Sequence, residues 1–443
     1  MEGKDLTKGN LIKNMFKLLI PIVFINLLNS LYNIVDAIWI GRLIGESGVS
    51  AITNCYPIIL FILAFGVAIS TSAAVLVSRF YGEKDDEKIK TTMGTAYLLS
   101  LVLSIVIAIL MFIFSEILLK ALNTPLEILQ DARTYLVIYV CGLIFNFLLM
   151  VIMEGLKAIG NSKTPLIFVG IGAILNIILD PIFIKIGSGI KGAAIATLIS
   201  MIISSIIGII YINKKSKLLK IDIKYLKLNY EYFKNIVKIG LPIIVQQWGV
   251  TMVITFEVYI ANISGVIGSA AYGVISKLEQ VFLVVAGSFT TVATVTVGQF
   301  IGNKKVEEAK VIIKEGLKLG IVPTILIAII VFVIQRPIVG MFVESETVIE
   351  IALKYLAVVG IAYVLLPTRQ LVNGFIIGTA HTGFIILTSI VANIFEIGTI
   401  LILRNNGTEN LTALGWGIIV WMVVEMSMQI TYVISNKWQK EVI

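Results

Sequence analysis

The chain has 443 residues, of which 58% are hydrophobic and only 14% are charged, and its formal net charge is +8. A soluble domain has about 25% charged residues, so this chain cannot cover a water-facing surface with charge. Most basic residues lie in the segments between the apolar runs, where they act as topology signals, so we expect no nucleic-acid partner. Apolar runs such as YLLSLVLSIVIAILMFIF lack the period of two that a barrel strand would show. Composition therefore predicts an all-α polytopic membrane protein that resides in a lipid bilayer.

Twelve apolar helical spans are predicted along the chain, each long enough to cross a hydrocarbon core of roughly 30 Å. The first half holds six of them, at 14–40, 51–80, 92–115, 128–153, 164–184 and 190–213. The second half holds the other six, at 235–262, 271–300, 311–335, 350–373, 382–404 and 414–436.

The distribution of Lys and Arg predicts the orientation of these spans. With the N-terminus inside, the inner segments hold about 25 of the 35 basic residues, which is a strong positive-inside bias. We therefore expect both termini to be cytoplasmic. The composition, rich in Ile and Lys and poor in Cys, suggests the plasma membrane of a prokaryote.

The two halves of the sequence are related. Pro21 in KLLIPIV and Pro242 in KIGLPIIV are 221 residues apart, and the same separation carries Asp36 onto Glu257. An even number of spans in each half makes these parallel repeats, a design typical of secondary transporters. We predict a six-helix lobe at 1–213, a cytoplasmic linker at 214–234 and a second six-helix lobe at 235–443.

Polar residues inside the first span share one helical face. Asn26, Asn29, Asn33 and Asp36 follow one another at spacings of 3, 4 and 3. Lipid cannot satisfy such a face, so another helix or a watery cavity must do so. An ionised carboxylate there costs a few kcal/mol unless it pairs, takes up a proton or binds a cation.

Two further motifs of the first half supply oxygen ligands. Asn176 and Asp180 lie one turn apart in NIILD, ahead of Pro181, which removes a backbone donor. Thr197 lies among the small residues of GAAIATLIS, which permit close helix packing. With Asp36 these residues make a plausible site for Na⁺ or for a proton. The alternative is that the two aspartates only join helices through buried hydrogen bonds.

The second half is less polar at the matching positions, so we place the main coupling site in the first lobe. Charged residues nevertheless occur within its spans and could line a cavity, attract a charged compound or neutralise one another: Glu257, Lys277, Glu279, Arg369, Glu396 and Glu425. The chain has two Cys and one His, and it lacks the known hydrolase, zinc-protease and nucleotide-binding motifs. We expect no cofactor and no enzymatic activity.

The motifs LIPIVFINLLNSLYNIVDAIWIGR, SRFYGEKD, GNSKTP, NIILDP and GAAIAT together resemble the multidrug and toxic compound extrusion (MATE) family, over the whole chain. The resemblance is to the bacterial and archaeal branch with a cation site in the first lobe. It implies that Asp36, Asn176, Asp180 and Thr197 bind the coupling cation. It also implies that Pro21 permits helix 1 to bend and that Tyr135 lies near the site. Another branch of the family uses an acidic cluster in its seventh and tenth membrane spans, which correspond here to 235–262 and 350–373. Glu257 matches its first member, but Pro367 stands near the position of the second.

These observations predict a cation-coupled antiporter, using H⁺ or Na⁺, that exports amphipathic and often cationic organic compounds by alternating access. We expect it to function as a monomer. Substrate contacts are expected from Asn33, Tyr135, Glu257, Lys277 and Glu279. The nearest alternative is a flippase for a lipid-linked cell-envelope precursor, and a membrane-embedded enzyme and a channel are the others.

Overall fold

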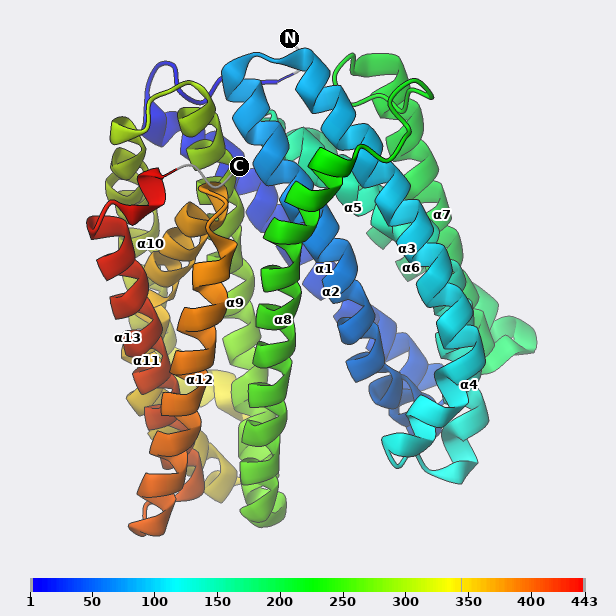
Figure 1. The fold of residues 1–443 in the computed structure, drawn as a ribbon. Helices are drawn as coiled ribbons and strands as arrows, with labels where there is room; N and C mark the ends of the chain where they lie inside the picture. Colours follow the sequence, from blue (N-terminus) through cyan, green and yellow to red (C-terminus); the bar gives the residue numbers. More distant parts are fainter. Residues whose placement is uncertain (1–2, 344, 441–443) are drawn as a thin grey trace. The chain divides into compact units, whose positions relative to one another are not determined.

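The computed structural model describes residues 3–343 and 345–440, and within these ranges the chain forms helices and turns without any strand (Figure 1). The helices of the first half are α1 (Leu11–Leu43), α2 (Glu46–Glu83), α3 (Asp86–Ala121), α4 (Leu126–Cys141), α5 (Leu143–Ala158), α6 (Lys163–Phe183), the π-helical turn η1 (Ile184–Ser188) and α7 (Gly189–Lys215). Those of the second half are α8 (Tyr230–Ile263), α9 (Gly265–Gly302), the 3₁₀ turn η2 (Glu307–Lys310), α10 (Val311–Gly340), α11 (Glu346–Gly378), α12 (Thr382–Asn405), α13 (Asn410–Ile434) and the 3₁₀ turn η3 (Lys437–Gln439).

The predicted all-α polytopic membrane fold is confirmed. In the described part of the chain, nine helices are long and apolar enough to cross a membrane, and the count rises to twelve if each of three bent pairs is one span. Every one of the twelve predicted spans falls on one of these helices or pairs. Several helices extend well beyond the predicted apolar limits; α9, for example, has 38 residues.

The predicted span 128–153 is a bent pair rather than one straight helix. Helices α4 and α5 meet at Gly142 with an angle of 48°. Glycine weakens a helix, and here it also admits a close neighbour, because a Cβ at Gly142 would lie 2.8 Å from the sulfur of Met201. Helix α7, which carries Met201, therefore packs directly against the bend.

Each of the other two bends lies N-terminal to a proline. The two segments of α10 meet at 55°, with non-helical backbone angles at Ile334, and those of α11 meet at 46°. Pro337 and Pro367 follow these bends within one to two turns. A proline removes one backbone donor and clashes with the preceding turn, so the helix tilts there.

The described chain divides into two compact units. Of the described residues, the first unit comprises 3–6, Lys17–Ile244 and Gly302–Lys304, and the second comprises Thr7–Phe16, Val245–Ile301, 305–343 and 345–440. The lobe limits expected from the sequence, 1–213 and 235–443, stay a prediction of how the chain is organised into domains.

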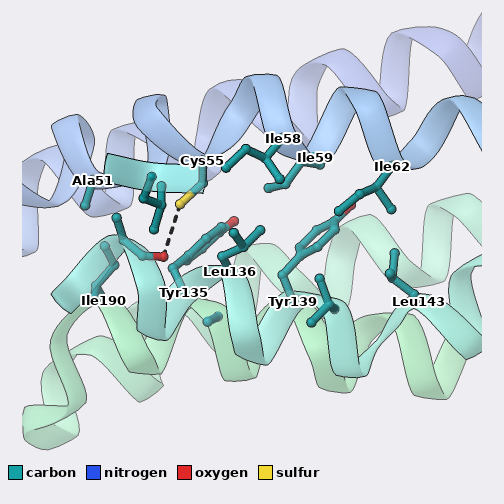
Figure 2. Close-up of a cluster of buried hydrophobic side chains, with 14 of the residues drawn as sticks. Ala51, Cys55, Ile58, Ile59, Ile62, Tyr135, Leu136, Tyr139, Leu143 and Ile190 are labelled. Carbon is teal, nitrogen blue, oxygen red and sulfur yellow. Dashed lines mark hydrogen bonds between the residues drawn. The ribbon is translucent and has the colours of Figure 1, made fainter. Parts of the chain in front are cut away.

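Helices α2, α3, α4, α5 and α7 contribute to the apolar core of the first unit, part of which is drawn in Figure 2. Ile58 and Ile62 of α2 pack against Tyr135 and Tyr139 of α4, whose rings stack with centroids 6.4 Å apart. The buried thiol of Cys55 donates a hydrogen bond to the carbonyl oxygen of Ala132 over 3.1 Å. The apolar residues of these spans therefore form a packed interior and do not all face lipid.

The linker between α7 and α8 is a strap bound to the first unit, and residues 216–229 contain turns without a helix. The Tyr97 hydroxyl donates to the Leu219 carbonyl over 2.8 Å, and the Tyr225 hydroxyl donates to the Glu87 carboxylate over 2.7 Å. At Gly94 the strap comes so close that a Cβ would lie 2.0 Å from the Tyr225 carbonyl oxygen. Within the strap, the backbone N–H of Lys224 donates to Asp222 and lowers the pKa of that carboxyl.

Candidate functional site

The four residues predicted as a cation site come together in the first unit from three helices. Asp36 lies on α1, Asn176 and Asp180 lie on α6, and Thr197 lies on α7. All four are buried, with exposed fractions of 8%, 0%, 0% and 1% respectively. These four polar side chains are therefore enclosed by helices, as polar groups within a membrane require.

Small residues allow α6 and α7 to approach closely at this site. The exposed fraction is at most 1% for each of Ala193, Ala194 and Ala196. A Cβ on Gly192 would lie 2.5 Å from the Phe183 carbonyl oxygen. The predicted role of the GAAIAT motif in close packing is therefore confirmed. Helix α6 continues past Pro181 to Phe183 and then widens into the π-helical turn η1, so the proline does not end it.

Hydrogen bonds through the Asn176 amide link α6 to α7. Its Nδ2 atom donates to Asp180 Oδ1 over 3.1 Å and to Thr197 Oγ1 over 3.2 Å. Across from it, the carboxyl groups of Asp36 and Asp180 are close enough to interact electrostatically. Two carboxyl groups this close in a low-dielectric interior cannot both stay ionised without a counter-charge.

Three oxygens of this site are buried and have no hydrogen-bond donor in the described part of the chain: Asp36 Oδ1, Asn176 Oδ1 and Asp180 Oδ2. A buried polar atom without a partner costs about 1–3 kcal/mol, and more when it is charged. Oxygen atoms of carboxylates, amides and hydroxyls are the ligands that hard cations prefer, and a shared proton would equally satisfy the carboxyl pair. These oxygen atoms therefore form a set of ligands that fits Na⁺ or H⁺.

The other residues expected near this site have different surroundings. Asn33 is exposed on α1, and so is Asn29, so of the four polar residues on that face only Asp36 is buried. Tyr135 lies in the apolar core beside Tyr139, although its hydroxyl still interacts electrostatically with Asp36. Helix α1 runs unbroken through Pro21.

Tyr32 also belongs to this site, although it was not among the residues predicted from the sequence. It lies close to the Thr197 hydroxyl and interacts with both Asp36 and Asp180. Its spacing was a usable signal, because Tyr32 precedes Asp36 by one helical turn and so shares its face. A phenol hydroxyl there can supply or accept a hydrogen bond as the carboxyl pair changes its charge.

In the second unit, Glu257 and Glu396 are buried acids and Glu279 is a half-buried one; tyrosines donate hydrogen bonds to Glu257 and Glu279. Glu257 accepts a hydrogen bond from the Tyr272 hydroxyl over 2.9 Å. Glu279 accepts two, from Tyr355 over 2.8 Å and from Tyr363 over 2.6 Å. Glu396 is 2% exposed and interacts with Glu257. Among the residues that the structure describes, however, no group of three or more His, Cys, Asp or Glu side chains has the arrangement of a metal site.

A buried ion pair lies at the centre of a polar network in the same unit. Arg369 donates through Nε to Glu425 Oε2 over 2.6 Å, and its guanidinium stacks on the Trp421 ring at 4.1 Å. Glu425 Oε1 accepts from Ser389 over 3.1 Å and from Gln429 over 3.3 Å. Arg369 thus has its own partner, and this network joins α11, α12 and α13.

Lys277 and Glu279, which the sequence suggested as possible partners, point in different directions. Glu279 faces the tyrosines of α11, whereas Lys277 is exposed on α9. Residues two apart on a helix do not face each other. No ion pair between them occurs in the described chain.

Membrane-spanning helices in two related halves, with a buried carboxyl pair, define the class of secondary transporters. The sequence model of the MatE family matches residues 21–182 and again 242–402, so the two matches begin at the paired positions Pro21 and Pro242. The chain belongs to this family, whose members are transporters.

Curated relatives and a solved structure agree with this assignment. The probable multidrug resistance protein YoeA of Bacillus subtilis is 25% identical over 400 residues, which are 88% of this chain and 85% of YoeA. The multidrug export protein MepA of Staphylococcus aureus is 26% identical over 418 residues, or 93% and 91% of the two chains. A MOP superfamily transporter from Pyrococcus furiosus has the same fold, with a TM-score of 0.91, 22% identity and 99% of each chain covered.

Proposed function

We propose that this protein exports amphipathic organic compounds, including cations, across the plasma membrane of a prokaryote, in exchange for H⁺ or Na⁺. Family membership and the multidrug names of YoeA and MepA support the substrate class. The observation that carries the coupling is the carboxyl pair Asp36–Asp180 with three buried oxygens that lack donors.

In this proposal the coupling ion enters from outside and neutralises the carboxyl pair. Neutralisation removes the repulsion between Asp36 and Asp180 and changes how α1 packs on α6 and α7. The compound then leaves the first unit, and the transporter returns inward to release the ion, with both termini on the cytoplasmic side. An ion can drive this cycle only if it binds the two states with different affinity.

The test uses proteoliposomes loaded with the cationic dye rhodamine 6G and driven separately by a Na⁺ gradient or a pH gradient. We expect one gradient to drive dye movement in the wild type, and Asp36→Asn and Asp180→Asn each to abolish it. Asp131→Asn is the matched control, because Asp131 is an exposed carboxylate on α4 outside the site. The assignment of the site would be wrong if Asp36→Asn kept full gradient-driven export. Dye movement in neither gradient, with folded wild-type protein, would favour the lipid-linked flippase.

A further inference from the structure

Lys277 is a charged side chain within an apolar span that the proposed coupling mechanism does not use. It and Glu279 are the only charged residues of α9. Glu279 is turned towards Tyr355 and Tyr363, which donate to its Oε1 atom. Lys277 is exposed, and no ion pair in residues 3–343 and 345–440 includes it. The ammonium group therefore needs a partner from outside the helix.

Lys277 lies deep in the span. A collar of polar residues marks the end of the second unit near the start of α9: Asn410 donates to Ser264 over 2.8 Å, and Ser269 donates to Asn262 over 2.6 Å. Lys277 follows this collar by eight to thirteen residues, so at 1.5 Å per residue it lies about 12–20 Å further along the helix. That is close to the centre of a hydrocarbon core roughly 30 Å thick, and a four-carbon stem is too short to bring the ammonium group back to the collar.

The surface around Lys277 is open and partly polar, with Val281 as its exposed apolar member. Gln280, three residues on, is also exposed. Gly273, four residues back, is exposed, and a Cβ placed there would meet no atom within 4 Å. These three positions share one helical face. Hydrocarbon chains cannot satisfy an ammonium and a carboxamide, so this face borders a space that water or a transported compound can enter.

We propose that Lys277, assisted by Gln280, binds an anionic group of the transported compound. This inference rests on the proposed export function and narrows its substrate class to include amphiphiles that carry a carboxylate or phosphate. An ammonium in a low-dielectric setting forms a strong charge-assisted hydrogen bond with such a group. Amphiphiles without an anionic group do not use this contact.

Two cationic dyes that share the xanthene ring system test the proposal. Rhodamine B has a free carboxylate, whereas rhodamine 6G carries an ester at that position. In proteoliposomes with the driving gradient, Lys277→Gln should slow rhodamine B export by at least about tenfold, because a hydrogen bond to a charged group contributes about 1.5–3 kcal/mol. Rhodamine 6G export should stay within about twofold of wild type. Lys277→Arg should keep most rhodamine B export, and Gln280→Lys should raise it. Lys191→Gln, which removes an exposed lysine at the start of α7, is the control and should change neither rate.

Each outcome bears on the role of Lys277. Equal loss of both dyes in Lys277→Gln, or loss of neither, would overturn the proposal while leaving export itself established by the wild-type rhodamine 6G rate. A third arm follows a short-chain fluorescent phosphatidic acid by dithionite quenching. If Lys277→Gln stopped movement of that lipid but not of rhodamine B, the lysine would serve a lipid phosphate and the proposed contact with a small amphiphile would be wrong.

Discussion

Removal of the guanidinium at position 369 should sharply destabilise the second unit. Arg369 is 5% exposed and Glu425 is fully buried, so Arg369→Met leaves a carboxylate without its counter-charge in the interior. The bonds from Ser389 and Gln429 would remain on its other oxygen, but they carry no positive charge. Breaking a buried pair in this way costs about 3–5 kcal/mol.

The size of the effect can be converted to a melting temperature. For a unit of this size, 1 kcal/mol corresponds to about 2–4 °C, so Arg369→Met should lower Tm by roughly 6–20 °C. In the double variant Arg369→Met with Glu425→Gln, no charge is left unpaired and the amide can keep both remaining partners. The double variant should then lose no more than about 2 kcal/mol, the contribution of the stack on Trp421.

The assay is thermal unfolding of purified protein in detergent, followed by circular dichroism at a fixed scan rate. Arg336→Met is the matched control, because Arg336 pairs with Glu350 over 3.0 Å and is 55% exposed. A surface pair contributes about 0–1 kcal/mol, so this control should shift Tm by a few degrees at most. The reasoning fails if Arg369→Met lowers Tm no more than Arg336→Met does. It also fails if the double variant loses as much stability as the single variants Arg369→Met and Glu425→Gln lose together.

Three further predictions follow from other contacts. Gly94→Ala should push the linker strap away from α3, because its Cβ would lie 2.0 Å from the Tyr225 carbonyl oxygen. Trypsin should then cut the strap severalfold faster than in wild type. Gly398→Ala is the control and should match wild type, because no atom lies within 4 Å of the added Cβ. Tyr355→Phe and Tyr363→Phe each remove a hydrogen-bond donor from the half-buried Glu279 and should lower the free energy of unfolding by about 1–3 kcal/mol in thermal unfolding. Tyr56→Phe is the control, because Tyr56 is 52% exposed, and it should leave stability unchanged. Pro21→Ala restores a backbone donor inside α1, so we expect slower export with unchanged dye binding; equal export rates would show that α1 does not bend there.

Much of the fold could be predicted from the sequence, because hydropathy and helix length alone decide which segments can cross a bilayer. All twelve predicted spans fall on helices, and the repeat seen in Pro21 and Pro242 reappears in the two family matches. Of the three bends, the one at Gly142 could not be foreseen, because the glycine's effect depends on Met201 of another helix approaching it.

The candidate coupling site was also visible in the sequence. The spacing of Asn176 and Asp180 puts both side chains on one helical face. Asp36 is a carboxylate in an apolar span and needs a partner, so it could be assigned to the same site. The resemblance to a known family supplied the link between them. Burial and the unpaired oxygens of this group are facts of packing that only three assembled helices could produce.

The second unit shows what spacing could not decide. Comparison with the first half suggested a drier interior, because only equivalent positions were compared. The ion pair Arg369–Glu425 and the tyrosines around Glu279 join residues 56, 76 and 84 positions apart. Which way Lys277 and Glu279 point is decided by what packs on α9. Local periodicity fixes the face on which a residue lies, but only the neighbours of that face determine whether its charge meets a partner, lipid or water.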